Sequence, residues 1–238
     1  MSMQDTPTAQ GLALRRAQYL QLEDKLGKLA LLILFLWHFS QVSGALVRMI
    51  AEPQHGLMWW LGFVSTICSV GFVALIVFLT VTRTQPVDVE PGFEARFSAF
   101  MGTFVLLALI AIPPAGVVVL QALVAKVLII IGTVSSIWCL WWLGRSFAVM
   151  AAARKLVIAG PYAWVRHPLY ATESLIVIGC VLLNGTAPAF AIGALQFFFQ
   201  YRRMVNEEKV LSRALEGYSD YMTRTPMVIP RLSGRIAD

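Results

Sequence analysis

The stretch VVVLQALVAKVLIIIGTVSSIWCLWWL, residues 117–143, contains a single charged residue, Lys126. An α-helix rises about 1.5 Å per residue, so about 20 apolar residues span the hydrocarbon core of a bilayer. This stretch exceeds that length and therefore predicts a transmembrane helix.

The rest of the chain has the same character. Of its 238 residues, 58% are hydrophobic and only 13% are charged, whereas soluble domains are usually about 45–50% apolar and about 25% charged. Further apolar runs cover residues 29–50, 57–82, 97–112, 169–183 and 189–204. The sequence therefore predicts an all-α fold, a polytopic membrane bundle of about six transmembrane helices.

Three of these runs are short for a membrane span. Residues 97–112 end at Pro113 and Pro114, and the last two runs are separated only by the turn NGTAP, residues 184–188. A connection this short makes helices 169–183 and 189–204 antiparallel neighbours. We expect them to form a tight hairpin that tilts or stops short of the far face.

The basic residues are distributed unevenly about the predicted spans. Of the 19 Lys and Arg residues, all but Arg48 and Lys126 fall at the two ends of the chain or in the loops 83–96 and 144–168. Cytoplasmic loops of membrane proteins carry such an excess, so both termini and these loops are predicted to be cytoplasmic. A basic face beside anionic lipid also accounts for the net charge of +6 without a nucleic-acid partner.

The N-terminus is polar and mixed in charge, and it lacks the apolar core and cleavage site of a secretory signal. The predicted spans divide the sequence into a cytoplasmic N-terminal segment, residues 1–28, four transmembrane helices, residues 29–143, and a C-terminal region with a loop, a helical hairpin and a cytoplasmic tail, residues 144–238.

Cysteine usage points to no special chemistry. Cys68, Cys139 and Cys180 each lie in an apolar run and share no close spacing. They are expected to be small buried residues, and neither a metal site nor a disulfide framework is predicted.

The segment GPYAWVRHPLY, residues 160–170, places a polar cluster between two apolar stretches. Gly160-Pro161 is a turn signal, and Pro168 suits the first turn of a helix. Arg166, however, would meet the positive end of the helix dipole, which is unfavourable unless an anion is bound there. We therefore expect an anion or cofactor site at this loop, with interfacial snorkelling of the arginine as the alternative.

A second polar segment, QYRRMVNEEKVLSRALEGYSDYMTRTPMVIPRL, covers residues 200–232. If it is helical, the adjacent Glu207 and Glu208 do not share one face, so one faces inward while the other is solvated or pairs with an arginine. Tyr218 and Tyr221 predict that the tail folds back. Because the hairpin places both polar segments side by side, we expect a pocket between them at the membrane–cytoplasm boundary.

Together the two segments resemble the isoprenylcysteine carboxyl methyltransferase family, integral membrane methyltransferases that also include relatives acting on phospholipid amines. The resemblance covers about residues 141–232 and begins with WWLGRSF, residues 141–147. The elements that carry it are Gly160-Pro161-Tyr162, Arg166-His167-Pro168 with Tyr170, then Arg203, Glu207-Glu208, Leu211, Tyr218, Tyr221 and Ile229-Pro230.

The resemblance implies that S-adenosylmethionine binds between the loop and the tail. It implies cofactor contacts from Gly160, Pro161, Tyr162, Val165, His167, Pro168, Tyr170, Glu207, Tyr218 and Tyr221, and catalytic roles for Arg166, Glu207 and Glu208. These residue types suit the cofactor, whose carboxylate fits a cation or a helix N-terminus and whose ammonium fits a glutamate. Methyl transfer depends more on positioning than on proton transfer. No metal is implied.

The resemblance predicts a methyltransferase that acts on a lipophilic acceptor from the bilayer, by carboxyl O-methylation of an isoprenylcysteine-like substrate. Two positions after Tyr170 the family usually has a small residue, often glycine, whereas this chain has Thr172 followed by Glu173. A carboxylate at the start of a membrane helix is costly without a cavity or partner. Other acceptors remain open: a phospholipid, a thiol or another small hydrophobic molecule. A sterol-reductase-like oxidoreductase with a nicotinamide cofactor is a second class. A transporter or scaffold is a third, but it predicts charges at the midplane, whereas here they gather on one face.

Overall fold

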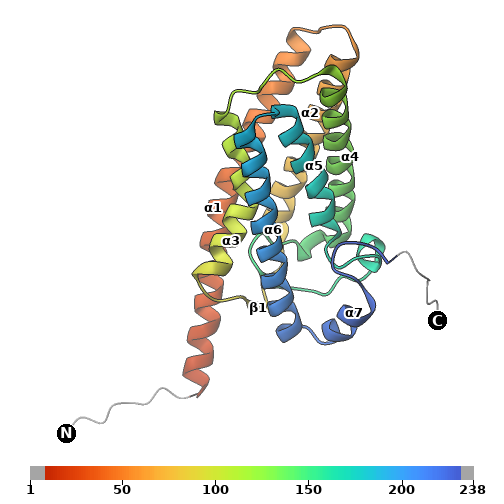
Figure 1. The fold of residues 1–238 in the computed structure, drawn as a ribbon. Coiled ribbons are helices and arrows are strands. Elements are labelled where there is room, and N and C mark those ends of the chain that lie inside the picture. Colours follow the sequence, from red (N-terminus) through yellow and green to blue (C-terminus); the bar gives the residue numbers. More distant parts are fainter. Residues whose placement is uncertain (1–8, 232–238) are drawn as a thin grey trace.

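The computed structural model describes residues 9–231, which form a bundle of helices with one pair of very short strands (Figure 1). The helical elements are α1 Ala9–Ala51, α2 Leu57–Thr82, α3 Phe93–Phe104 with the 3₁₀ turn Val105–Ala111, α4 Val119–Leu143, the 3₁₀ turns Gly144–Ser146 and Gly160–Ala163, α5 Pro168–Asn184, α6 Ala187–Ala214 and α7 Tyr218–Arg224. The two strands are β1 Asp88–Val89 and β2 Ala152–Ala153. The predicted all-α membrane bundle is confirmed.

Four segments are long and apolar enough to cross a membrane: Lys25–Ala51, Leu57–Thr82, Phe93–Ala111 and Val119–Ser146. The helix α5 is apolar but shorter. The apolar part of α6 ends at Arg202, where charged residues begin. Each of the six predicted runs forms a helix along the length of the bundle (Figure 1).

The predicted bounds differ most from the helices at two places. The helix α1 begins at Ala9 and not near residue 29, and α6 continues to Ala214 and not only to residue 204. Apolar runs mark the part of a helix that meets lipid, while backbone hydrogen bonds continue into the polar residues on either side. Both helices therefore project beyond their apolar parts.

The hairpin of α5 and α6 is as tight as predicted. Gly185 adopts a left-handed conformation with φ of 72° after the end of α5, which favours glycine there. The Thr186 hydroxyl then accepts a hydrogen bond from the Ala189 amide at 3.3 Å and caps α6. The side-chain amide of Asn184 donates to the Ile112 carbonyl at 3.0 Å and fixes the hairpin to the chain after α3.

The helices α4 and α5 pack with close backbone contact. A methyl group at Gly132 would lie 2.9 Å from the Thr172 carbonyl oxygen, and one at Gly179 would lie 2.7 Å from the Ala125 carbonyl oxygen. Small residues permit this approach, which brings van der Waals contact where no hydrophobic effect drives association in lipid. The helix α5 is therefore held against α4 along much of its length.

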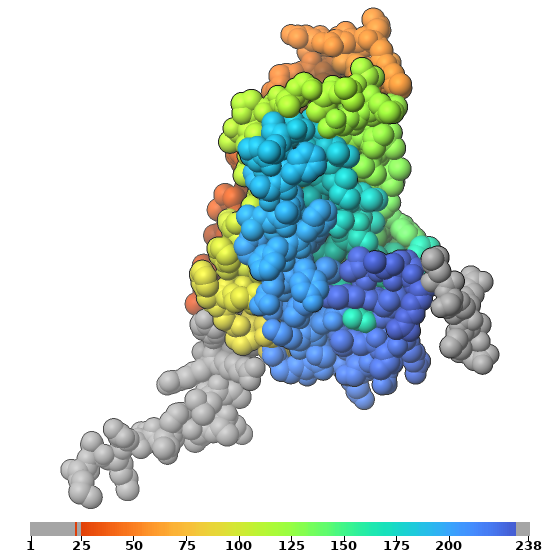
Figure 2. Space-filling view, viewed as in Figure 1, coloured from red at the N-terminus to blue at the C-terminus, as the bar shows by residue number. Residues whose placement is uncertain are grey.

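One end of the bundle carries the strands and α7, and we call it the loop end. Here β1 pairs with β2 antiparallel, with Asp88 opposite Ala153, which the sequence did not predict. Arg213 from α6 binds this pair, because its Nε donates to Asp88 Oδ2 at 2.7 Å and its Nη1 to Glu90 Oε2 at 3.0 Å. The loops on either side of β1 and β2 are thus joined to the end of α6, and α6 forms a continuous surface with the C-terminal segment at this end (Figure 2).

We expect Gly179→Ala to lower the unfolding free energy by about 1–3 kcal/mol, because its new methyl group meets backbone and forces α4 and α5 apart. Thermal unfolding of the detergent-solubilised chain measures this. Gly71→Ala is the matched control, because its methyl group would only reach Ile137 Cδ1 at 4.0 Å. Equal stability of the two variants would contradict the close contact of α4 with α5.

Candidate functional site

The predicted meeting of the two polar segments occurs at the loop end. The tail after α7 runs along the residues that precede α5, where the Arg166 amide donates to the Pro226 carbonyl and the His167 amide to the Met227 carbonyl, both at 2.9 Å. The Tyr221 hydroxyl adds a hydrogen bond to the Tyr162 carbonyl at 2.5 Å. The tail therefore folds back onto the loop, as Tyr218 and Tyr221 had predicted.

Arg166 finds its partners within the protein. Its Nε donates to Glu208 Oε1 at 2.7 Å, and its Nη1 donates to the carbonyls of Met222 at 3.1 Å and Thr225 at 2.6 Å. These carbonyls lie at the C-terminal end of α7, which is the negative end of its dipole. A carboxylate and a helix end thus compensate the arginine beside the α5 N-terminus.

Glu208 also lies 3.1 Å from His167, measured from Oε1 to Nε2. Burial raises the pKa of the Glu208 carboxyl, but the hydrogen bonds with His167 and Arg166 outweigh it, so the pKa lies below its ordinary value of 4.5. Glu208 is therefore ionised at neutral pH, and it links α6 to the residues that directly precede α5.

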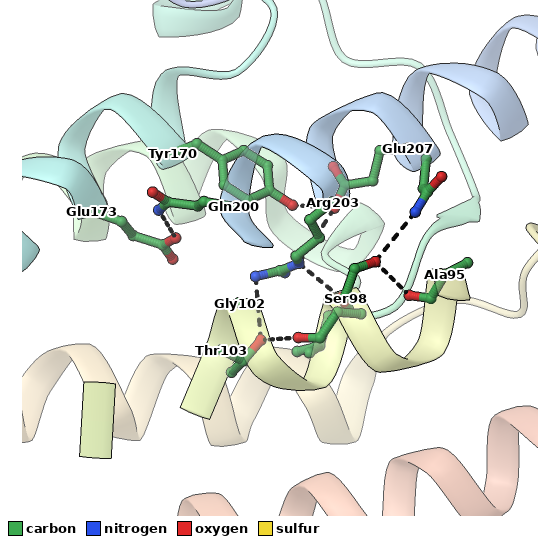
Figure 3. A network of polar contacts seen from close by, with 12 residues as sticks. Ala95, Ser98, Gly102, Thr103, Tyr170, Glu173, Gln200, Arg203 and Glu207 are labelled. Atoms are coloured by element: carbon green, nitrogen blue, oxygen red, sulfur yellow. Dashed lines mark hydrogen bonds and ion pairs between the residues drawn. The ribbon is translucent and has the colours of Figure 1, made fainter. Parts of the chain in front are cut away.

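Glu207 faces a different set of partners (Figure 3). The Tyr170 hydroxyl donates a hydrogen bond to its carboxylate, while Arg203 Nε lies 3.8 Å from Oε1. Arg203 is 5% exposed and its guanidinium lies 5.0 Å from the centre of the Tyr170 ring. Of the two adjacent glutamates, Glu208 is thus the one paired closely with an arginine, and Glu207 is the one beside the cavity.

A cavity lies between the loop and the tail, with an empty volume of about 750 Å³ that includes space open to solvent. Its walls are Leu143, Ser146, Ala148, Ala152, Arg154, Lys155, Leu156, Val157, Tyr162, Arg166, His167, Leu169, Tyr170, Arg203, Glu207, Leu211, Tyr218 and Tyr221. The wall thus combines charged and aromatic groups with aliphatic side chains.

Tyr162 stands out in this wall. The residue is 6% exposed, and its buried hydroxyl has no hydrogen-bond partner among the described residues. Burial raises its pKa well above the ordinary value of 10, so the hydroxyl remains protonated. A buried polar group without a partner costs free energy, and a bound ligand with an acceptor atom would remove that cost.

The structure divides the predicted site residues into two sets. Those that line the cavity are Tyr162, Arg166, His167, Tyr170, Glu207, Tyr218 and Tyr221, and those outside its lining are Gly160, Pro161, Val165, Pro168 and Glu208. The second set supports the segment that carries the first. Val165 is buried and Pro168 begins α5. Gly160 packs closely on Trp142, because a methyl group at this glycine would lie 2.4 Å from the ring.

The sequence assigned no site role to several residues of the wall. Arg154 and Lys155 belong to the basic loop, and Arg203 and Leu211 belong to the motif of residues 200–232. Leu156 and Val157 lie in an irregular loop, where no helix or strand period exists to predict a facing side. The sequence signal that could have identified Arg203 is its positive charge within a motif that also carries two glutamates.

Residues 120–217 match the model of the phospholipid methyltransferase family. This family lies within the group of integral membrane methyltransferases that the sequence resemblance predicted. The matched region runs from α4 to the end of α6 and includes the loop that enters α5.

Two relatives are similar to the chain over part of its length. It is 35% identical over 103 residues to the nickel-cobalt-cadmium resistance protein NccN of Alcaligenes xylosoxydans xylosoxydans, which covers 42% of this chain and 46% of that protein. It is 33% identical over 107 residues to the cobalt-zinc-cadmium resistance protein CzcN of Cupriavidus metallidurans, which covers 43% and 46%. The similarity therefore spans about half the length of either relative.

We expect the stability of the chain to fall in acid through Glu208. Because its folded-state pKa is lowered, its contribution is complete above the unfolded pKa of about 4.5 and is lost as the pH falls through the lower folded value. Thermal unfolding measured from about pH 7 to about pH 3 tests this. Glu208→Gln should be less stable at neutral pH and should lose less on acidification, and parallel curves for the two proteins would contradict the assignment.

Proposed function

We propose that this chain is an S-adenosylmethionine-dependent methyltransferase that acts on a lipophilic acceptor supplied from the bilayer. The observation that carries the proposal is the cavity formed jointly by the α5 entry and the returning tail at one end of a membrane bundle. The family match over residues 120–217 supports methyl transfer. The excess of Lys and Arg at this end supports a cytoplasmic site.

The wall of the cavity fits the parts of this methyl donor. The Glu207 carboxylate suits the donor ammonium, and His167 suits its carboxylate. The buried Tyr162 hydroxyl offers a hydrogen bond that no described residue accepts. When bound, S-adenosylmethionine supplies a methyl group activated by its sulfonium, so the protein groups are required to bind, orient and exclude water.

Glu208 has a supporting role in this proposal. It contacts both Arg166 and His167 and holds these two side chains where the tail closes over the loop. The hydrogen bonds of Arg166 to the Met222 and Thr225 carbonyls hold the tail in turn. Arg166 therefore both lines the cavity and holds the tail that closes the site.

For the acceptor we propose a carboxylate on an isoprenylcysteine-like molecule. A carboxylate is already ionised at neutral pH and needs no general base, and Arg166 provides a cation that can orient it. The aliphatic part of the wall, Leu143, Leu156, Val157 and Leu169, suits a hydrocarbon chain.

A phospholipid amine is the second candidate acceptor, because the matched family is that of phospholipid methyltransferases. An amine must be unprotonated to attack, so this reaction would require a proton acceptor in the cavity. In this alternative Glu207, which lies in the wall, would accept that proton and would not pair with the donor ammonium.

We expect Glu207→Gln to weaken binding of S-adenosylmethionine about tenfold, because a hydrogen bond to a charged group is replaced by a neutral one. Equilibrium dialysis of the purified chain in lipid nanodiscs measures the affinity. Glu216→Gln is the matched control, since this carboxylate is exposed in the turn between α6 and α7. Equal affinities of the two variants would remove Glu207 from the donor site.

A radiolabelled methyl donor distinguishes the acceptors. We expect label in a base-labile ester when the wild-type chain receives a prenylated cysteine with a free carboxylate, and no label when that carboxylate is already esterified. Phosphatidylethanolamine is the comparison, and label in its head group alone would favour the second candidate.

Arg166→Ala should lower the rate of methyl transfer about 100-fold or more, because cavity wall and tail closure are lost together.

A further inference from the structure

A second cavity lies at the loop end, beside the one described above. It has an empty volume of about 500 Å³ that includes space open to solvent. Three arginines line it, Arg83, Arg96 and Arg154, and we call it the arginine cavity. The described residues of its wall include none of those assigned above to the methyl donor.

The wall of the arginine cavity lies at the level where the apolar spans end (Figure 1). Gly27, which belongs to this wall, is near the start of the span Lys25–Ala51. Arg83 directly follows the last residue of α2, and Arg96 lies in the first turn of α3. Because the apolar part of a span matches the hydrocarbon core of a bilayer, the cavity lies at the level of the lipid head groups.

The charge of the described wall is predominantly positive. It holds three guanidiniums and one carboxylate, Glu90, whose Oε2 is bound by Arg213 Nη1 at 3.0 Å. Arg83, Arg96 and Arg154 also have contacts within the protein. A guanidinium carries five N–H donors, however, and can bind a protein group and a phosphate oxygen together. Since its planar fork fits phosphate geometry, the wall suits a phosphate group.

The helices that border the cavity expose apolar side chains close to it. Leu29 follows Gly27 by two residues on α1 and is exposed. Phe97 directly follows Arg96 on α3 and is also exposed. A molecule with a phosphate among the arginines would therefore find apolar surface beside the cavity for hydrocarbon chains.

We propose that the arginine cavity binds the phosphate of an anionic phospholipid, whose acyl chains lie along the exposed apolar surface of α1 and α3. Basic pockets between transmembrane helices recognise such head groups on the cytoplasmic side of a membrane. The position at head-group level, the three guanidiniums and the neighbouring apolar side chains support this assignment. It does not depend on methyl transfer, because the lipid occupies a cavity outside the donor site.

The lipid site adjoins the candidate site without being part of it. Ala148, Ala152 and Arg154 line both cavities. The Glu90 amide donates to the Ala151 carbonyl at 2.9 Å and fixes this stretch of loop to the chain after β1. A bound phospholipid would therefore contact the same loop that borders the donor cavity.

Lipid binding is measured on the purified full chain in a neutral detergent, with a short-chain phosphatidylglycerol that carries a fluorophore on one acyl chain. Unlabelled phosphatidylglycerol, phosphatidylcholine of the same chain length and inorganic phosphate compete with it, and fluorescence anisotropy reports the displacement. We expect phosphatidylglycerol to compete about tenfold more strongly than phosphatidylcholine, whose ammonium offsets the charge of its phosphate. Inorganic phosphate should compete least, because it lacks acyl chains.

Arg83→Gln and Arg96→Gln test the guanidiniums. Each should lower the affinity for phosphatidylglycerol about tenfold, because hydrogen bonds between charged groups are lost. Arg224→Gln is the matched control, since it removes the same charge from an exposed arginine at the end of α7. This control should leave the affinity unchanged.

Gly27→Leu tests the cavity with all three arginines kept. A methyl group at Gly27 would meet no atom within 4 Å, so a larger side chain can extend into the cavity without strain on the fold. We expect this variant to bind phosphatidylglycerol about tenfold more weakly. Gly27→Ala fills little of the space and should change the affinity less than about threefold.

Equal affinities of Arg83→Gln, Arg96→Gln and Arg224→Gln would overturn the inference. Equal competition by phosphatidylcholine would mean a site for acyl chains alone, and equal competition by inorganic phosphate would mean a site for free phosphate; either result would also overturn it. If both arginine variants fail to fold, Gly27→Leu decides, and an unchanged affinity there would sink the assignment. A wild-type chain that binds phosphatidylglycerol but not S-adenosylmethionine would contradict the proposed function and leave the lipid site standing.

Discussion

The contacts of Arg166 are the constraint on which the site depends. This arginine stands beside the positive end of α5, where its own charge is unfavourable, and it is compensated by Glu208 and by the carbonyls at the end of α7. Because these partners come from α6 and from the returning tail, neutralising one charge brings three separate segments together. The cavity is the space that remains between them.

The packing of the apolar helices determines where these three segments emerge. Close contact of α4 with α5 at Gly132 and Gly179 holds the start of α5 in place, and the tight turn at Gly185 determines where α6 returns. The residues that emerge from these helices at the loop end therefore meet in a defined register. Arg213 then joins α6 to the strand pair of β1 and β2, which positions the loop that forms the opposite wall.

Two arginines and two adjacent glutamates form two pairs in the site that differ in how closely they approach. Arg166 and Glu208 form a short ion pair that closes the site, whereas Arg203 and Glu207 remain farther apart beside the cavity. Adjacent residues of a helix point in directions about 100° apart, so the two carboxylates meet different partners although they are neighbours in sequence. A loosely paired carboxylate and a buried tyrosine hydroxyl suit a small ligand that carries both a positive charge and hydrogen-bond acceptors.

The sequence alone determined the helical class, the six apolar runs and the two polar segments, because these depend on composition and on local spacing. It also indicated that the segments meet, since the turn at 184–188 leaves the hairpin no other arrangement. Only the tertiary structure decided which glutamate lines the cavity, that Arg166 is satisfied by the tail, and that Arg154, Lys155, Leu156 and Val157 contribute to the wall. Those outcomes depend on how helices rotate about their axes and on where an irregular loop passes, and both are settled by contacts between residues far apart in the chain.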